Sequence, residues 1–150
     1  MDALIIFRKL KYLPDIKYAD GDAARFCSQR EDYVGYNRPA ILEMWRQVGE
    51  LQTDEQGIAF RGLLVRHMVL PENLSGTSKC MWFLASEMGP SVWVSMMSQY
   101  FPAHKALQIP PLDRKPSAKE YRDAFQTLVE LGLSNGFVQD RAHHADPFSV

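Results

Sequence analysis

An α/β fold with a mainly parallel sheet is predicted for this chain, and two observations predict it. Apolar, strand-like runs recur at residues 12–18, 62–70 and 92–100. Amphipathic segments with helical spacing separate these runs, which is the alternation typical of βαβ units with right-handed crossovers. A chain of 150 residues can bury one modest core, so we expect a single domain over residues 1–150.

The first strand, residues 12–18, precedes a helix that we expect to begin at Pro39 and to end at Gly49. Proline is tolerated in the first helical turn, where its missing N–H would have no partner, and glycine is common just after a helix. The apolar stripe of this helix is formed by Ile41, Leu42, Trp45 and Val48.

Pro71 closes the second strand, because proline cannot donate to a sheet ladder. A second helix is expected next, capped by Ser75 or Thr77 and ended by Gly89-Pro90. Its apolar stripe consists of Met81, Leu84, Ala85 and Met88.

The third strand leads into a proline-rich loop over residues 101–116. Ser117 and Glu120 then form a capping box that begins a third helix, which Gly132 ends. We expect its inward side chains to be Tyr121, Phe125 and Leu128.

The C-terminal part of the sequence is less regular. A short apolar piece at Phe137-Val138 is expected to be a fourth, edge strand. Residues 141–150 are polar and are expected to form a frayed tail.

Composition excludes several classes of protein. Lys and Arg number 17 against 18 Asp and Glu, giving a net charge of -1, so no basic surface for nucleic acid is predicted. We find neither a signal peptide nor a membrane-spanning run and expect a cytoplasmic protein. The two cysteines, Cys27 and Cys80, are isolated, which predicts buried thiols and no metal site.

Polar residues within the strands predict a site. Asp15 and Lys17 share one face of the first strand, Arg66 lies within the second, and Gln99 and Tyr100 end the third. Ligands of parallel sheets bind at the C-terminal strand ends, and a buried Arg66 would need an anion. The structural alternatives are a local ion pair between Asp15 and Lys17, and an Arg66 satisfied by a neighbouring carboxylate or by carbonyls.

The histidines are given structural interpretations. His67 points to the face opposite Arg66, so we interpret it as a histidine that packs against a helix with a satisfied nitrogen. His104 and Lys105 lie in the proline-rich loop, where solvation is the expected state.

Four ordered segments carry a resemblance to a known family: residues 12–20 (YLPDIKYAD), 43–49 (EMWRQVG), 62–71 (GLLVRHMVLP) and 98–102 (SQYFP). From residue 12 to residue 132 the chain resembles the C-terminal half of a radical S-adenosylmethionine (SAM) protein related to the pyruvate formate-lyase activating proteins. The resemblance implies part of a TIM-barrel-like (β/α)₆ barrel that holds SAM and an iron-sulfur [4Fe-4S] cluster. Such proteins cleave SAM reductively to a 5′-deoxyadenosyl radical, which abstracts a hydrogen atom.

The resemblance also implies roles for the strand residues. Lys17 matches a lysine that in relatives reaches the methionyl carboxylate of SAM, Asp15 matches its companion acid, and Arg66 matches an arginine that touches the same cosubstrate. Gln99 and Tyr100 fall in the last matching segment, and we expect them to bind the cofactor together with these three residues. A cationic side chain for the carboxylate and an acid for the ammonium complement SAM chemically.

The cluster motif of the family, Cys-x-x-x-Cys-x-x-Cys, is absent from this sequence. We therefore expect neither the cluster nor SAM to bind stably to this chain alone, and assign no catalytic residue. The first hypothesis is that this chain is a fragment, the SAM and substrate side of a radical enzyme. Its expected partner is a cluster-bearing N-terminal half or a protein substrate. The alternative is a non-catalytic barrel remnant that acts as an interaction module.

Overall fold

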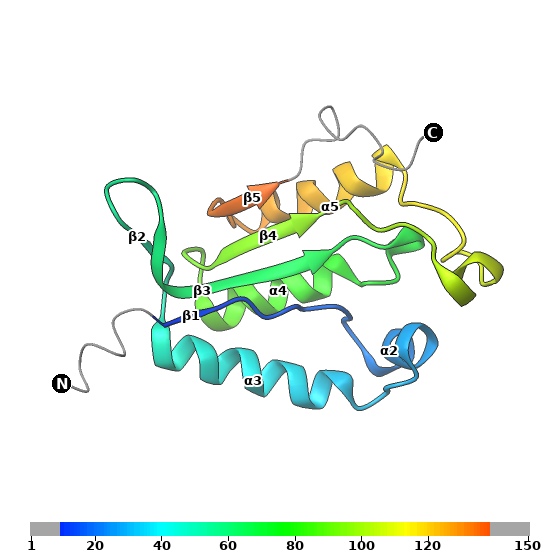
Figure 1. The fold of residues 1–150 in the computed structure, drawn as a ribbon, viewed down its shortest axis with the longest axis horizontal. Helices are drawn as coiled ribbons and strands as arrows, with labels where there is room; N and C mark the ends of the chain where they lie inside the picture. Colours follow the sequence, from blue (N-terminus) through cyan, green and yellow to red (C-terminus); the bar gives the residue numbers. More distant parts are fainter. Residues whose placement is uncertain (1–9, 139–150) are drawn as a thin grey trace.

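The computed structural model describes residues 10–138, which form an α/β fold (Figure 1). Its elements follow in the order β1 (Lys11–Tyr12), α2 (Gly21–Ser28), α3 (Tyr33–Val48), β2 (Gln52–Thr53), β3 (Ala59–Met68), η2 (Pro71–Asn73), α4 (Thr77–Met88), β4 (Trp93–Met97), η3 (His104–Gln108), α5 (Ala118–Glu130) and β5 (Gly136–Val138). The residues expected to form a frayed tail, 141–150, lie outside the described part of the chain.

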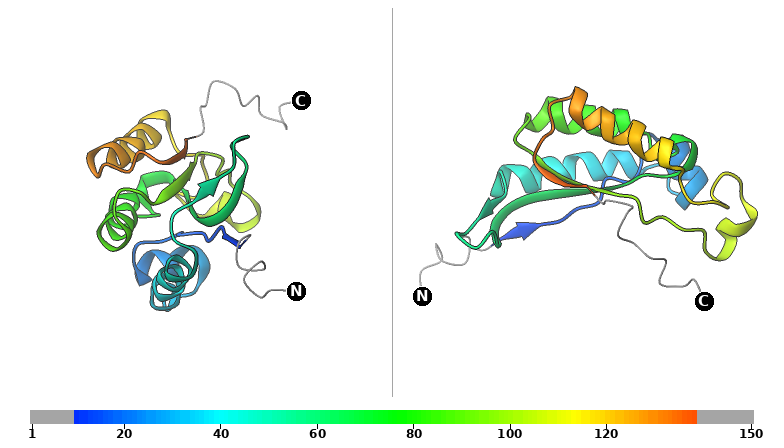
Figure 2. Two further views of the ribbon diagram at one scale, coloured as in Figure 1. Left: turned by 90° about the vertical axis from the view of Figure 1, so that its left-hand side faces the viewer. Right: turned by 90° about the horizontal axis from the view of Figure 1, so that it is seen from above.

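The predicted sheet, mainly parallel and alternating with helices, is confirmed. Its strand order is β1-β3-β4-β5, and every pair along that order is parallel. The short strand β2 is antiparallel to the start of β3. Helices α3, α4 and α5 all lie against one face of the sheet, and no helix within residues 10–138 covers the other face (Figure 2). We call this second face the open face.

The core lies between the sheet and the helices. Alternate residues of β3, Leu63, Val65 and His67, are fully buried on the helix side. Leu63 and Val65 belong to one apolar cluster with residues of α3, α4, β4 and α5. None of the helices within residues 10–138 combines the length and the apolar character that crossing a bilayer requires.

The first strand is shorter than predicted. Regular pairing covers only β1, and a separate bridge joins Asp15 to Arg66. Pro14 causes the interruption, because it has no N–H to donate, although its carbonyl accepts a hydrogen bond from Arg66 N at 2.9 Å. The register is the same on both sides of Pro14, so residues 11–16 follow β3 as one extended segment.

The second and third strands end earlier than predicted. β3 ends at Met68 and β4 ends at Met97, whereas the predicted runs continue to Leu70 and Tyr100. Beyond the strand ends, Leu70 and Tyr100 line a cavity, which is described below.

Helix α3 begins at Tyr33, so the prediction of a start at Pro39 is wrong and this proline lies inside the helix. Contacts with the neighbouring strand override the local signal, since Tyr33 and Asn37 both donate side-chain hydrogen bonds to the Asp15 carbonyl. The predicted end at Gly49 is confirmed.

Helix α4 ends at Gly89 as predicted, but neither Ser75 nor Thr77 caps its start. Gly76 is the N-cap residue, with φ of 62°, and the Asn73 side chain accepts the hydrogen bond from Thr77 N at 3.0 Å. The hydroxyls of Ser75 and Thr77 are engaged in a buried network described below.

Helix α5 begins with the predicted capping box of Ser117 and Glu120. Tyr121 and Leu128 are buried as expected, whereas Phe125 is 41% exposed and Ala124 is buried in its place. The reason is geometric: at 100° per residue, positions 121, 124 and 128 group closely, and position 125 lies at the edge of that stripe. The predicted edge strand at Phe137-Val138 is confirmed as β5.

Replacing Glu120 with alanine is expected to lower the free energy of unfolding by about 1–2 kcal/mol at pH 7. Its carboxylate accepts hydrogen bonds from Arg114 at 2.8 and 2.9 Å and from the backbone N–H groups of Ser117 and Glu72. These bonds, the one from Arg114 above all, hold the pKa of Glu120 far below its usual range.

Because the folded-state pKa is lowered, this stabilisation is present above the unfolded pKa and is lost only as the pH falls through the folded value. Urea unfolding at several pH values should show the difference between wild type and variant persisting down to pH 4. The matched control is Glu130→Ala at the other end of α5. An equal loss in both variants would contradict the special role of Glu120.

Candidate functional site

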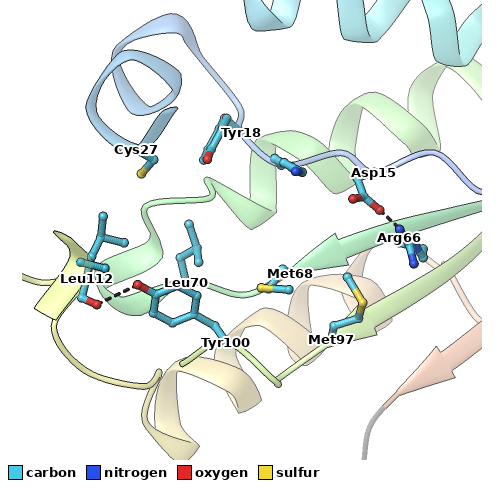
Figure 3. Close-up of a pocket in the computed structure, with 11 residues that line it drawn as sticks. Asp15, Tyr18, Cys27, Arg66, Met68, Leu70, Met97, Tyr100 and Leu112 are labelled. Atoms are coloured by element: carbon cyan, nitrogen blue, oxygen red, sulfur yellow. Dashed lines mark hydrogen bonds and ion pairs between the residues drawn. The ribbon is translucent and has the colours of Figure 1, made fainter. Parts of the chain in front are cut away.

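A cavity of about 310 Å³ lies at the C-terminal ends of β1, β3 and β4 (Figure 3). Its walls come from the ends of β3 and β4, from the segments that follow β1, β3 and β4, from α2, and from the loop that contains η3. This is the edge at which parallel sheets bind ligands. The cavity has a charged end and an apolar end, which we describe in turn.

The charged end consists of Asp15, Lys17 and Arg66. Arg66 Nε donates to Asp15 Oδ1 at 2.8 Å, and the two side chains are 44% and 30% exposed. The prediction of a buried Arg66 is therefore wrong, because its side chain points to the open face, which no helix in the described part of the chain covers. Asp15 forms its ion pair with Arg66 and not with Lys17. This arrangement is the structural alternative given above for Arg66, an arginine paired with a neighbouring carboxylate.

Helix α3 fixes the backbone that carries this charged end. The Tyr33 hydroxyl donates to the Asp15 carbonyl at 3.1 Å and accepts from Lys17 N at 2.9 Å. Asn37 Nδ2 donates to the same carbonyl at 2.9 Å, and Arg38 Nη2 donates to the Tyr18 carbonyl at 2.9 Å. These bonds hold the backbone from Asp15 to Tyr18 in place, and so determine where the side chains of Asp15 and Lys17 begin.

The apolar end is lined by thioethers, aromatic rings and aliphatic groups: Met68, Met97, Tyr18, Tyr100, Leu70 and Leu112. Cys27 of α2 and Ala106 of η3 complete it. The Tyr18 and Ser28 hydroxyls are hydrogen-bonded at 2.5 Å, and the Tyr100 hydroxyl donates to the Leu112 carbonyl at 2.7 Å. Burial raises the pKa of Tyr18, Tyr100 and the Cys27 thiol, so all three are neutral near pH 7.

The structure brings most of the predicted site residues together. Asp15, Lys17, Arg66 and Tyr100 all line the cavity. Gln99 does not, since it is exposed and its amide contacts Met97 Sδ at 3.5 Å. Side chains alternate along an extended chain, so Gln99 and its neighbour Tyr100 point in different directions.

Sequence reasoning missed α2 and the two wall residues Tyr18 and Cys27. A local signal for this helix was present, because Asp20 is its N-cap and accepts a hydrogen bond from Ala23 N at 3.0 Å. An aspartate followed by a short apolar-spaced run is therefore the signal that could have placed Cys27 on a helix beside the site.

His67 lies directly behind the site on the helix side, as predicted, with both ring nitrogens bonded. Nδ1 is 2.7 Å from the Ile16 carbonyl and Nε2 is 2.9 Å from Thr77 Oγ1. A carbonyl only accepts, so Nδ1 carries the proton and Nε2 accepts from the Thr77 hydroxyl. Ser75 Oγ lies 3.5 Å from Thr77 Oγ1 and accepts from Leu70 N, which extends the network.

The cysteines of this chain do not fit a [4Fe-4S] cluster. Such clusters are bound by several thiolates, and the sequence contains only two cysteines. Cys27 lines the cavity, whereas Cys80 is fully buried against the backbone of Ser75. Within residues 10–138 no three His, Cys, Asp or Glu side chains are grouped as metal ligands would be.

Comparison with known proteins identifies no relative: no family model, no curated protein and no solved structure matches the chain. The class of protein that fold and site define is therefore an α/β protein with a ligand-sized cavity at the C-terminal edge of a parallel sheet.

Proposed function

We propose that this chain is the SAM and substrate side of a radical SAM protein of the pyruvate formate-lyase activating type. The single observation that carries the proposal is the convergence of Asp15, Lys17 and Arg66 at one end of a cavity on the open face. In this proposal the sheet is a segment of a (β/α) barrel and the open face is the barrel interior. The helices on the opposite face match that arrangement.

The charged end suits the methionyl group of SAM. Lys17 provides an ammonium for its carboxylate, and Asp15 provides a carboxylate for its ammonium. The Asp15–Arg66 pair is partly exposed, and such pairs contribute only about 0–1 kcal/mol to stability. Asp15 can therefore exchange Arg66 for a ligand at little cost, and Arg66 is then available for a ligand carboxylate.

Reductive cleavage of SAM requires a cluster that the cysteines of this chain do not fit. The proposal therefore assigns cosubstrate binding to this chain and expects it to be inactive alone, beside a cytoplasmic partner that bears the cluster. The second candidate, a non-catalytic interaction module, is favoured by one observation. The edges of the sheet expose apolar side chains, with Leu13 52% exposed beyond β1 and Phe137 56% exposed in β5.

Weak, transient contact between SAM and the isolated chain is expected, and saturation-transfer NMR should detect it. Lys17→Ala and Asp15→Asn should each weaken this contact about ten- to a hundredfold, because each removes a charge-assisted hydrogen bond. The matched control is Lys105→Ala, which removes an exposed lysine from the loop that borders the cavity without touching its lining.

Equal SAM signals in the wild type and in all three variants would refute the assignment of the charged end. Absence of any SAM contact, together with self-association in analytical ultracentrifugation that Leu13→Lys abolishes, would favour the interaction module.

A further inference from the structure

The apolar end of the cavity offers almost no free hydrogen-bonding group to a ligand. The hydroxyls of Tyr18 and Tyr100 are already bonded within the protein, and the Cys27 thiol is a weak donor. A polar ligand group placed there would give up its hydrogen bonds to water without replacement. This end of the cavity therefore suits a hydrocarbon group better than a polar one.

The charged end has an excess of one positive charge. Asp15 is compensated by Arg66 at 2.8 Å, and among the described residues no carboxylate is paired with Lys17. Lys17, Asp15 and Arg66 are the charged side chains in the lining that the structure describes. Their formal charges sum to a single positive charge, which favours an anion over a cation.

The charged and apolar ends of the cavity are separated along the direction of β3. Arg66 and Leu70 lie four residues apart in extended backbone, or roughly 13 Å at the rise of a parallel strand. A ligand that reaches both ends needs a chain several carbons long. We infer that this cavity binds a small apolar monocarboxylate, with its carboxylate against Lys17 and its hydrocarbon body between Leu70 and Leu112.

This inference goes beyond the proposed function, since it requires neither SAM nor a cluster. A titration of the full chain with octanoate, hexanoate, acetate, octylammonium and octanol tests it directly by calorimetry. Octanoate is expected to bind best, and each methylene added between acetate and octanoate should strengthen binding by roughly three- to fourfold until the apolar end is full. Octanol should bind about tenfold or more weakly than octanoate, and octylammonium more weakly still.

Two pairs of variants assign the binding to the two ends. Ala106→Asp introduces a carboxylate at the apolar end and should abolish octanoate binding, whereas Ala103→Asp on the same loop should leave it unchanged. Lys17→Ala should reduce octanoate affinity to that of octanol, whereas Lys105→Ala should not. Both alanine sites and Lys105 lie on a surface loop, so folding should survive and circular dichroism can confirm it.

Cys27 provides an internal reporter for the location of the ligand. Bound octanoate should slow its alkylation by iodoacetamide, and acetate should not. Cys80 is fully buried and should remain unlabelled in the folded protein, so Cys27→Ser supplies the background.

Three results would overturn the inference: equal affinities for octanoate and acetate, octanoate binding that Ala106→Asp leaves intact, or octanoate binding without protection of Cys27. The last result would place the ligand away from the apolar end of the cavity, which Cys27 lines. Because octanoate and SAM are titrated separately, failure of one does not imply failure of the other.

Discussion

Replacing Gly62 with alanine is expected to lower the free energy of unfolding by about 3–5 kcal/mol, a large part of the stability of an ordinary domain. Gly62 has φ of +116°, which L side chains rarely adopt, and an added Cβ would lie 2.4 Å from both Glu50 O and Leu51 Cα. Both neighbours are backbone, so no side chain can rotate away. The substitution must push apart β3 and the segment that leads into β2.

Alanine substitutions at two other glycines distinguish steric overlap from backbone strain as causes of this loss of stability. Gly57→Ala meets nothing within 4 Å but has φ of +77°, so it should cost about 1 kcal/mol through backbone strain alone. Gly35→Ala, inside α3 with nothing within 4 Å, should stabilise by about 0.5–1 kcal/mol. Urea unfolding measures all three, and a Gly62→Ala loss no larger than that of Gly57→Ala would contradict the predicted overlap.

Stability is expected to fall by about 3 kcal/mol between pH 6.5 and pH 4 because of His67 alone. Burial, the larger cause, and the nearby charge of Arg38 lower the pKa of His67 to about 4, against the opposing effect of its bond to the Ile16 carbonyl. In this window the unfolded chain binds a proton at His67 and the folded chain does not. The free energy of unfolding therefore decreases as the pH falls and is highest above pH 6.5.

A comparison of variants distinguishes the contribution of His67 to the pH dependence of stability from the contribution of the carboxylates. His67→Gln removes the titrating group, so its unfolding free energy should change by about 3 kcal/mol less than that of the wild type over the same window. His104→Gln, in the exposed η3 segment, should retain the wild-type dependence. Parallel pH curves for wild type and His67→Gln would show that His67 titrates normally in the folded protein.

The elements that sequence predicts well are those whose signal is local. The capping box at Ser117, the helix ends at Gly49 and Gly89 and the edge strand β5 each follow from a few adjacent residues. The errors lie where tertiary contacts decide. Helix α3 extends to Tyr33 because its first turns bond to the Asp15 carbonyl, and no pattern within residues 33–39 reveals that partner.

The candidate site shows the same division. Strand alternation predicted that Asp15 and Lys17 share a face and that Arg66 and His67 lie on opposite faces, because alternation is a local property of the backbone. The pairing of Asp15 with Arg66 depends on the register between two parallel strands, which sequence does not specify. The walls formed by Cys27 and Leu112 depend on how α2 and the loop after β4 pack over the strand ends.

The sheet register has a consequence for the order of folding. Asp15 and Arg66 are 51 residues apart in sequence, and closing so large a loop costs more entropy than forming α3 or the β2–β3 hairpin. Helices and hairpin can thus form while the segment after β1 is still undocked. Such a chain would have most of its secondary structure but no charged end, so ligand binding would report completion of this long-range contact.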